Sequence, residues 1–163
     1  MESVTRRLAL AATGAHELDD ALAERATLLL FDYLAVAIRG SASASSAAAR
    51  AALVSDSGHQ AAVVEGTGLR TSAHTAALVN AVSGHSIEMD DTHEPASLHA
   101  GVVVWPTVLA LGDQHATPPA EMLAAAVAGY DAACRVGAML GGATAYARGF
   151  HPTGVCGVFG AAA

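Results

Sequence analysis

Lysine is absent from this 163-residue chain, and all eight of its basic residues are arginine. The formal net charge is −7, and no basic cluster is present. A surface for nucleic acid or for an anionic membrane needs a basic patch, so the sequence argues against both kinds of partner. Chemistry that requires a lysine ammonium group or a Schiff base would have to come from outside this sequence.

Cysteines and long apolar runs are scarce as well. Cys134 and Cys156 lack CxxC spacing, and we interpret them as reduced thiols in the core. The apolar run LALAA near the N-terminus is shorter than the roughly 7–15 residues of a signal-peptide core. No uninterrupted apolar run reaches the roughly 18 residues of a membrane span. We therefore expect a cytoplasmic protein without a membrane segment.

Apolar residues, by contrast, make up 53% of the chain and are mainly Ala, Leu and Val, whereas aromatic residues make up only 4%. An alanine-rich sequence with so little strand-forming material favours helix. We predict one all-α domain, a multi-helix bundle, over residues 1–163. The GTG at 66–68 lacks the third glycine and the βαβ context of a dinucleotide loop, so no nucleotide cofactor is expected there.

Apolar periodicity and capping residues predict the individual elements. These are a long helix over 18–38, a helix within 47–55 that closes near Gly58, an extended segment over 61–68, helices over 73–84, 102–114 and 116–140, a glycine-punctuated loop from 141, and a last helix capped by Thr153. Thr71 or Ser72 is the expected cap before 73, and Thr117 the cap of the helix at 116–140. Pro106 is tolerable only near the first turn of its helix.

Charged residues make up only 14% of the chain but gather in the stretch GHSIEMDDTHEPASLHAG, Gly84 to Gly101. This stretch links two predicted apolar helices and holds four acidic residues and three of the eight histidines. Neighbouring carboxylates and imidazoles shift each other's pKa values, and loops on a rigid scaffold commonly carry catalytic groups. The alternatives are a solvated loop in which Asp91 or Thr92 caps a helix, and a Mg²⁺ site on the acidic pair.

A second candidate is RGFHPTG, residues 148–154, in which His151 stands between Phe150 and Pro152 at a predicted helix start. A histidine beside an aromatic residue can be a packed core group. At a helix N-terminus, however, free N–H groups favour a carboxylate ligand, which would suit an anionic substrate.

Together, HSIEMDDTHEPASLHAG and GFHPTGVCGVFGAAA, separated by an alanine-rich helix containing GYD, resemble the N-terminal part of the MmgE/PrpD family. This family includes 2-methylcitrate dehydratase, cis-aconitate decarboxylase and iminodisuccinate epimerase. The resemblance implies a large helical domain, of which this chain would hold the N-terminal part, with the smaller α+β domain of the family absent. It also implies a homodimer, small polycarboxylate substrates, no metal and no other cofactor.

By the same resemblance, the catalytic residues are His99, His151 and Asp90, and the substrate-binding residues are Asp91, Thr92 and Glu88. Glu88 stands where many relatives have aspartate, and Ala100 where a proline often follows the histidine. Proton transfer at a carbon next to a carboxylate suits histidine. The predicted activity is therefore dehydration of a hydroxy-tricarboxylate by a 2-methylcitrate dehydratase-like lyase of propionate metabolism.

The resemblance further implies a truncated chain, because relatives are much longer and hold their polyanionic substrates partly with lysines beyond the matched region. We expect the chain alone to be weakly active or inactive, and to associate with a second copy or with a missing C-terminal portion. Two alternatives stay open: a decarboxylase or epimerase of the same family, and an inactive helical fragment or subunit that acts through protein association.

Overall fold

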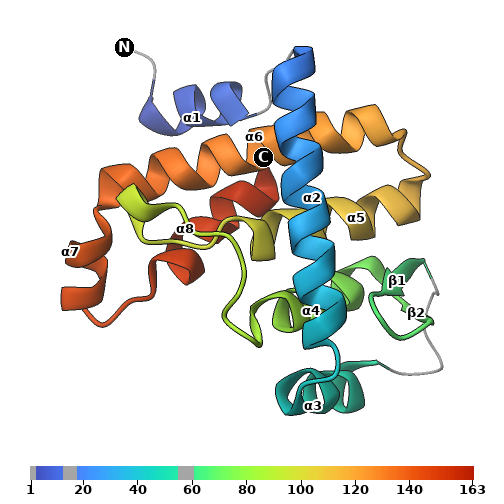
Figure 1. The fold of residues 1–163 in the computed structure, drawn as a ribbon. Helices are drawn as coiled ribbons and strands as arrows, with labels where there is room; N and C mark the ends of the chain where they lie inside the picture. The colour runs from blue at the N-terminus through green and yellow to red at the C-terminus, as the bar shows by residue number, and fades with distance from the viewer. Residues whose placement is uncertain (1–2, 13–17, 55–60) are drawn as a thin grey trace.

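The computed structural model describes residues 3–12, 18–54 and 61–163, and these are mostly helical, as predicted. The described part consists of eight α-helices, one 3-10 turn and a two-stranded antiparallel hairpin (Figure 1). In chain order the elements are α1 (Val4–Ala12), α2 (Asp20–Gly40), α3 (Ala44–Leu53), β1 (Ala62–Val64), β2 (Leu69–Thr71), α4 (Ala73–His85), η1 (Glu94–Ala96), α5 (Gly101–His115), α6 (Pro119–Leu140), α7 (Gly142–Ala147) and α8 (Pro152–Ala162). The predicted closure of a helix near Gly58 lies outside the described residues.

Side-chain caps start α2, α3 and α4. At α2, the Asp19 carboxylate accepts a hydrogen bond from the Leu22 N–H at 2.7 Å. Ser43 caps α3 in the same way, and Ser72 caps α4. Of the two predicted candidates at α4, the cap is therefore Ser72 and not Thr71. Each such bond satisfies an N–H that has no partner inside the helix, which stabilises by about 0.5–2 kcal/mol.

Two predicted caps are wrong. Thr117 does not cap α6, whose N-cap is Pro118 and which has no side-chain cap; the Pro118 carbonyl accepts from the Glu121 N–H at 3.0 Å instead. Thr153 does not cap α8, which already begins at Pro152. The Thr153 hydroxyl instead accepts a hydrogen bond from the backbone N–H of His99 at 2.9 Å, and so joins the two sequence motifs.

The start of α5 also differs from the prediction. Pro106 lies inside the second turn, because the helix already begins at Gly101. The Gly101 N–H donates to the Asp91 carboxylate at 2.9 Å, and a cap supplied from so far back in the chain leaves no local pattern. In addition, α1 forms where no helix was predicted, and α7 occupies part of the predicted glycine-punctuated loop.

The core lies where α2, α4, α6 and α8 pack against α5. Its central cluster joins side chains of three helices: Tyr33, Ala37, Val104, Trp105 and Ala126. In Figure 1, α5 and α6 run antiparallel across the molecule, α2 crosses in front of them, and α8 lies along α6. This packing brings the loop between α4 and α5 against the start of α8.

Among the described helices, α6 has the length and apolar composition that a membrane span requires. Core helices of soluble proteins pass the same test, and α6 packs against α5, α8 and η1. The length and apolar composition of α6 are therefore only weak evidence for a membrane segment.

Gly40 lets the end of α2 approach α4 closely. A Cβ atom at this position would collide with the backbone carbonyl oxygen of Ser83 and would lie 2.6 Å from Ser86 Oγ. We expect Gly40→Ala to lower the free energy of unfolding, measured by urea denaturation, by about 1–3 kcal/mol, because the packed backbone of α4 has to shift.

Gly154→Ala is the matched control for this substitution. Gly154 lies in α8, and no atom of the described residues lies within 4 Å of a Cβ atom added there. Alanine should therefore leave stability unchanged or raise it by up to about 1 kcal/mol through its higher helix propensity. Equal effects of the two substitutions would contradict the close approach of α2 and α4.

Candidate active site

The charged stretch forms the loop between α4 and α5, with His85 as the last residue of α4. The loop folds back on itself: an antiparallel bridge pairs His93 with Leu98, and the His93 N–H donates to the Leu98 carbonyl at 2.8 Å. Ser97 takes a left-handed backbone conformation, with φ of +50°, at the turn. This folding places His99 beside Asp90.

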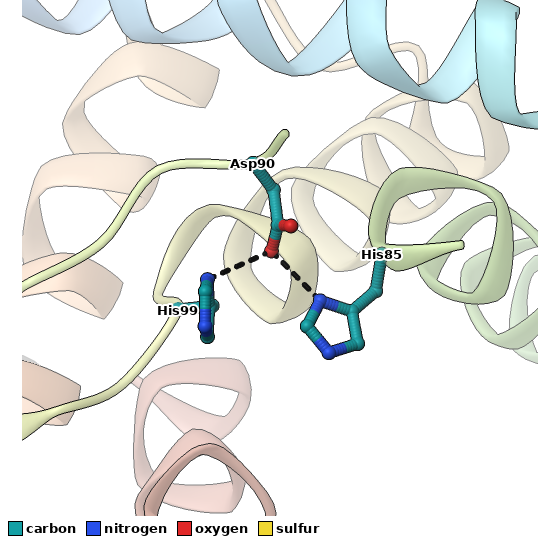
Figure 2. A group of neighbouring side chains, drawn as sticks. All are labelled: His85, Asp90 and His99. Atoms are coloured by element: carbon teal, nitrogen blue, oxygen red, sulfur yellow. Dashed lines mark hydrogen bonds and ion pairs between the residues drawn. The ribbon is translucent and has the colours of Figure 1, made fainter. Parts of the chain in front are cut away.

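One oxygen of Asp90 contacts two histidines (Figure 2). Asp90 Oδ2 lies 2.9 Å from Nδ1 of His85 and 3.1 Å from Nδ1 of His99. The Asp90 side chain is only 3% exposed, whereas the His85 and His99 side chains are 36% and 20% exposed. A buried carboxylate thus orients two imidazole rings that stay accessible to solvent.

The hydrogen bonds of His99 fix which ring nitrogen carries the proton. Its Nδ1 lies 2.9 Å from the backbone carbonyl oxygen of Asp91 as well as close to Asp90. Carbonyl and carboxylate oxygens only accept hydrogen bonds, so Nδ1 carries the hydrogen and Nε2 keeps its lone pair in the neutral ring. A histidine oriented in this way by a carboxylate has the arrangement of a general base.

Asp91 fixes the loop to the helices. Its Oδ1 accepts from the Gly101 N–H at 2.9 Å, and its Oδ2 accepts from the Tyr130 hydroxyl of α6 at 2.7 Å. Burial, together with the Asp91 charge, raises the pKa of Tyr130 far above its usual value, so the hydroxyl remains a donor. Both carboxylate oxygens are therefore engaged within the protein, and a contact of Asp91 with a substrate stays a prediction.

His151 reaches the same place from the other motif. It is the N-cap residue of α8 and is exposed. The centroid of its ring lies 6.3 Å from the ring centroids of both His85 and His99, and its plane is stacked at 26° to that of His99. The edge of the Tyr146 ring faces it at 5.6 Å. The structure therefore brings together His99 and His151, the two predicted catalytic histidines.

The remaining predicted site residues, Thr92 and Glu88, border this cluster. Thr92 Oγ1 lies 3.4 Å from His99 Nδ1. Glu88 is 74% exposed, and its Oε1 lies 3.5 Å from His85 Nε2. Glu88 also has a positive φ of 53°, which is uncommon for a residue other than glycine and is often found at functional sites.

His85 was given no role from the sequence, although it lies at the centre of the cluster. Its ring centroid is 5.0 Å from that of His99, and its partner Asp90 is only five positions further along the chain. The sequence did hold a signal for His85: a histidine at the end of a predicted helix, followed by acidic residues within one or two turns.

A metal ion is the competing use of these side chains. His85, Asp90 and His99 offer three ligand atoms that lie within 4.8 Å of one another. His99 Nδ1, the ring atom that contacts Asp90, has no lone pair available while Nδ1–H donates to the Asp91 carbonyl. The donor set therefore fits a hydrogen-bonded acid–base group better than a metal centre.

The histidines are open to solvent and do not line a neighbouring cavity between the helices. That cavity, of about 290 Å³, lies between α2, α5 and α6 and is mostly apolar. It shares Tyr130 with the site, through the hydroxyl that holds Asp91. A substrate bound at the histidines would consequently need a covering segment to exclude water.

The fold and the site define an α-helical domain that carries a cluster of three histidines and one aspartate on a loop and a helix start. The MmgE/PrpD N-terminal domain matches residues 9–163 of the chain. The chain belongs to the MmgE/PrpD family. A search of the curated proteins gave no match.

Proposed function

We propose that the chain carries the proton-transfer group of a cytoplasmic lyase for small polycarboxylates, similar to 2-methylcitrate dehydratase. Membership of the MmgE/PrpD family supports the class of enzyme. The observation that carries the proposal is the pair of histidines from the two motifs: His99, whose Nε2 lone pair is free, and His151, whose ring centroid lies 6.3 Å away.

Dehydration of a hydroxy-tricarboxylate removes a proton from one carbon and a hydroxyl group from its neighbour. His99 Nε2 takes the proton, the electron pair of the C–H bond forms the carbon–carbon double bond, and the C–O bond breaks. His151 donates the proton with which the hydroxyl group leaves as water. Asp90 stabilises the positive charge that forms on His99 through the contact at Nδ1, and each positioned acid or base contributes about 10² to 10⁴ in rate.

The surroundings of the rings supply the contacts to substrate. The Thr92 hydroxyl and the exposed Glu88 carboxylate border the cluster and suit hydroxyl groups of the substrate. The start of α8, immediately after His151, favours a substrate carboxylate because its first N–H groups point outward with the positive end of the helix dipole. Asp91 contributes by holding the loop.

The proposal includes a partner. The chain has no lysine, and three carboxylates, Glu88, Asp90 and Asp91, lie at the site, so the charge of a polycarboxylate is balanced only in part. Stabilisation of negative charge is often the largest catalytic contribution. We infer that a second copy of the chain or a C-terminal portion supplies cations and covers the exposed rings.

The decarboxylase and epimerase reactions that the family resemblance also implies need similar proton transfers. Either reaction is therefore an alternative activity for this site. A second candidate function is association without catalysis. Large apolar side chains on α2 support it, since Leu28, Phe31 and Ile38 are 55%, 65% and 54% exposed. Such a surface is typical of a helix that packs against a partner.

A dehydration assay tests the proposal. The chain is incubated with a panel of hydroxy-tricarboxylates, alone and with the product of the adjacent reading frame, and formation of the double bond is followed by ultraviolet absorbance. We expect turnover with the partner and little or none without it. Stable association without turnover on any substrate, including those of a decarboxylase or an epimerase, would favour the association function instead.

A further inference from the structure

We propose that His85 is the resident cation of the site: an imidazolium, protonated on both ring nitrogens, held between Asp90 and Glu88. The carboxylate of an anionic substrate would then bind at its Nε2, in the place that Glu88 occupies in the structure. The protonation of His85 is independent of the proposed enzymatic activity, whereas the contact with substrate rests on it.

The first step is the charge of Asp90. Its side chain is 3% exposed, and within the described part of the chain its Oδ1 has no hydrogen-bond partner. A buried carboxylate is strongly disfavoured unless a positive charge pairs with it. The groups that meet its Oδ2 are the imidazoles of His85 and His99, so a positive charge on one of the two would stabilise the ionised carboxylate.

The second step decides between the two rings. Among the residues that the structure describes, His99 contacts acceptors only at Nδ1, which one proton satisfies. His85 faces a carboxylate at each nitrogen: Asp90 Oδ2 at 2.9 Å from Nδ1, and Glu88 Oε1 at 3.5 Å from Nε2. A lone pair on Nε2 would point at a negative oxygen, whereas a proton there makes a favourable contact.

The third step concerns the other charged groups around His85. The rings of His99 and His151 face it at centroid distances of 5.0 Å and 6.3 Å. A second imidazolium at the nearer ring, which shares Asp90 Oδ2 with His85, would be repelled, so a charged His85 favours a neutral His99, the form that a general base needs. The three histidines thereby acquire different roles.

The fourth step concerns Glu88. Its carboxylate is 74% exposed, its contact with His85 is the longer of the two, and its backbone has a positive φ. An exposed ion pair is worth about 0–1 kcal/mol, so a substrate carboxylate can replace Glu88 at His85 Nε2, and Glu88 is then free to meet a substrate hydroxyl group. In a chain without lysine, His85 then supplies a cation for the substrate.

Nitrogen NMR of the histidine rings in the complete 163-residue chain tests the protonation directly. Long-range ¹H–¹⁵N spectra at neutral pH distinguish a nitrogen that carries a proton from one that carries a lone pair. We expect two protonated nitrogens for His85, and one protonated Nδ1 with one unprotonated Nε2 for His99. A lone pair on either nitrogen of His85 would overturn the proposal, and this result needs no variant and no activity.

Two variants separate the contributions of the carboxylates. Glu88→Gln should shift the His85 Nε2 signal toward that of an unprotonated nitrogen while His99 keeps its pattern. Glu94→Gln is the matched control, because Glu94 is an exposed acid of the same loop and the change in net charge is the same. An equal shift in both variants would show a general charge effect and contradict the specific contact.

Citrate is the probe for the contact with substrate. Its addition should shift the ring signals of His85 but not those of His115, which lies exposed at the end of α5. No shift at His85 would contradict the substrate contact. If His85 is doubly protonated but the dehydration assay shows no turnover, only the proposed function is contradicted. If turnover occurs but His85 is singly protonated, only this inference is contradicted.

Discussion

Replacement of His99 by alanine is expected to lower the turnover number of the assembled enzyme by about 10² to 10⁴, the usual loss for one positioned base. The reason is geometric: Asp90 and the Asp91 carbonyl hold the Nδ1–H of this ring, so its Nε2 is the one basic atom they leave free. The Michaelis constant should change much less, because the ring acts on the reacting carbon and not on the carboxylates that bind. Steady-state kinetics on the substrate of the assay measures both constants.

The same substitution at His151 should also lower turnover by orders of magnitude, since the leaving hydroxyl group then lacks its proton donor. His115→Ala is the control, because this exposed histidine lies at the far end of α5. Helix content by circular dichroism verifies that each variant is folded. Full turnover in both His99→Ala and His151→Ala would show that neither ring transfers a proton.

Helices were predictable where one chain segment carries its own start and stop signals. The long helix predicted over 18–38 is α2, which begins after the cap Asp19 and ends at Gly40. The helix after Ser72 was predicted for the same reason. The fold class followed from composition, since alanine-rich sequence with few aromatic residues leaves little material for strands.

The remaining features could not be predicted from the sequence, because they depend on contacts between segments that are distant in the chain. The start of α5 depends on Asp91, and the cap predicted at α8 was lost because Thr153 binds the backbone of His99. His85 was given no role because its place depends on the loop that brings it to Asp90 and on the fold-back at Ser97 that then adds His99. The two motifs were found from their residue types, but the geometry between them is set by packing that no local pattern encodes.

A buried acid that lies just after β1 gives the second large prediction. Glu65 follows β1 and is 8% exposed. It accepts a hydrogen bond from the Tyr33 hydroxyl at 2.7 Å, and its backbone N–H donates to Asn80 at 3.0 Å. Burial raises its pKa from 4.5 to about 7, the bond from Tyr33 lowers it, and the charge of Asp113 adds to the rise.

The sign of the pH effect follows from this raised pKa. Below about 4.5 the carboxyl group is protonated in both the folded and the unfolded chain, so burial carries no charge penalty. As the pH rises through 7, the folded protein has to bury a carboxylate that the unfolded chain leaves in water. The contribution of Glu65 to stability is therefore lost between about pH 4.5 and pH 7, and the loss is about 3 kcal/mol.

Glu65→Gln should remove this loss, because glutamine stays neutral and its amide oxygen still accepts the hydrogen bond from Tyr33. Urea denaturation should give equal stabilities for the two proteins at low pH and a variant more stable by about 3 kcal/mol above neutral pH. Glu24→Gln, at an exposed position of α2, should leave the pH dependence of the wild type unchanged. The other titrating groups are common to the wild type and Glu65→Gln, so their effects cancel in the difference between the two stabilities. Parallel curves of stability against pH for these two proteins would mean that Glu65 is as well solvated in the folded chain as in the unfolded one.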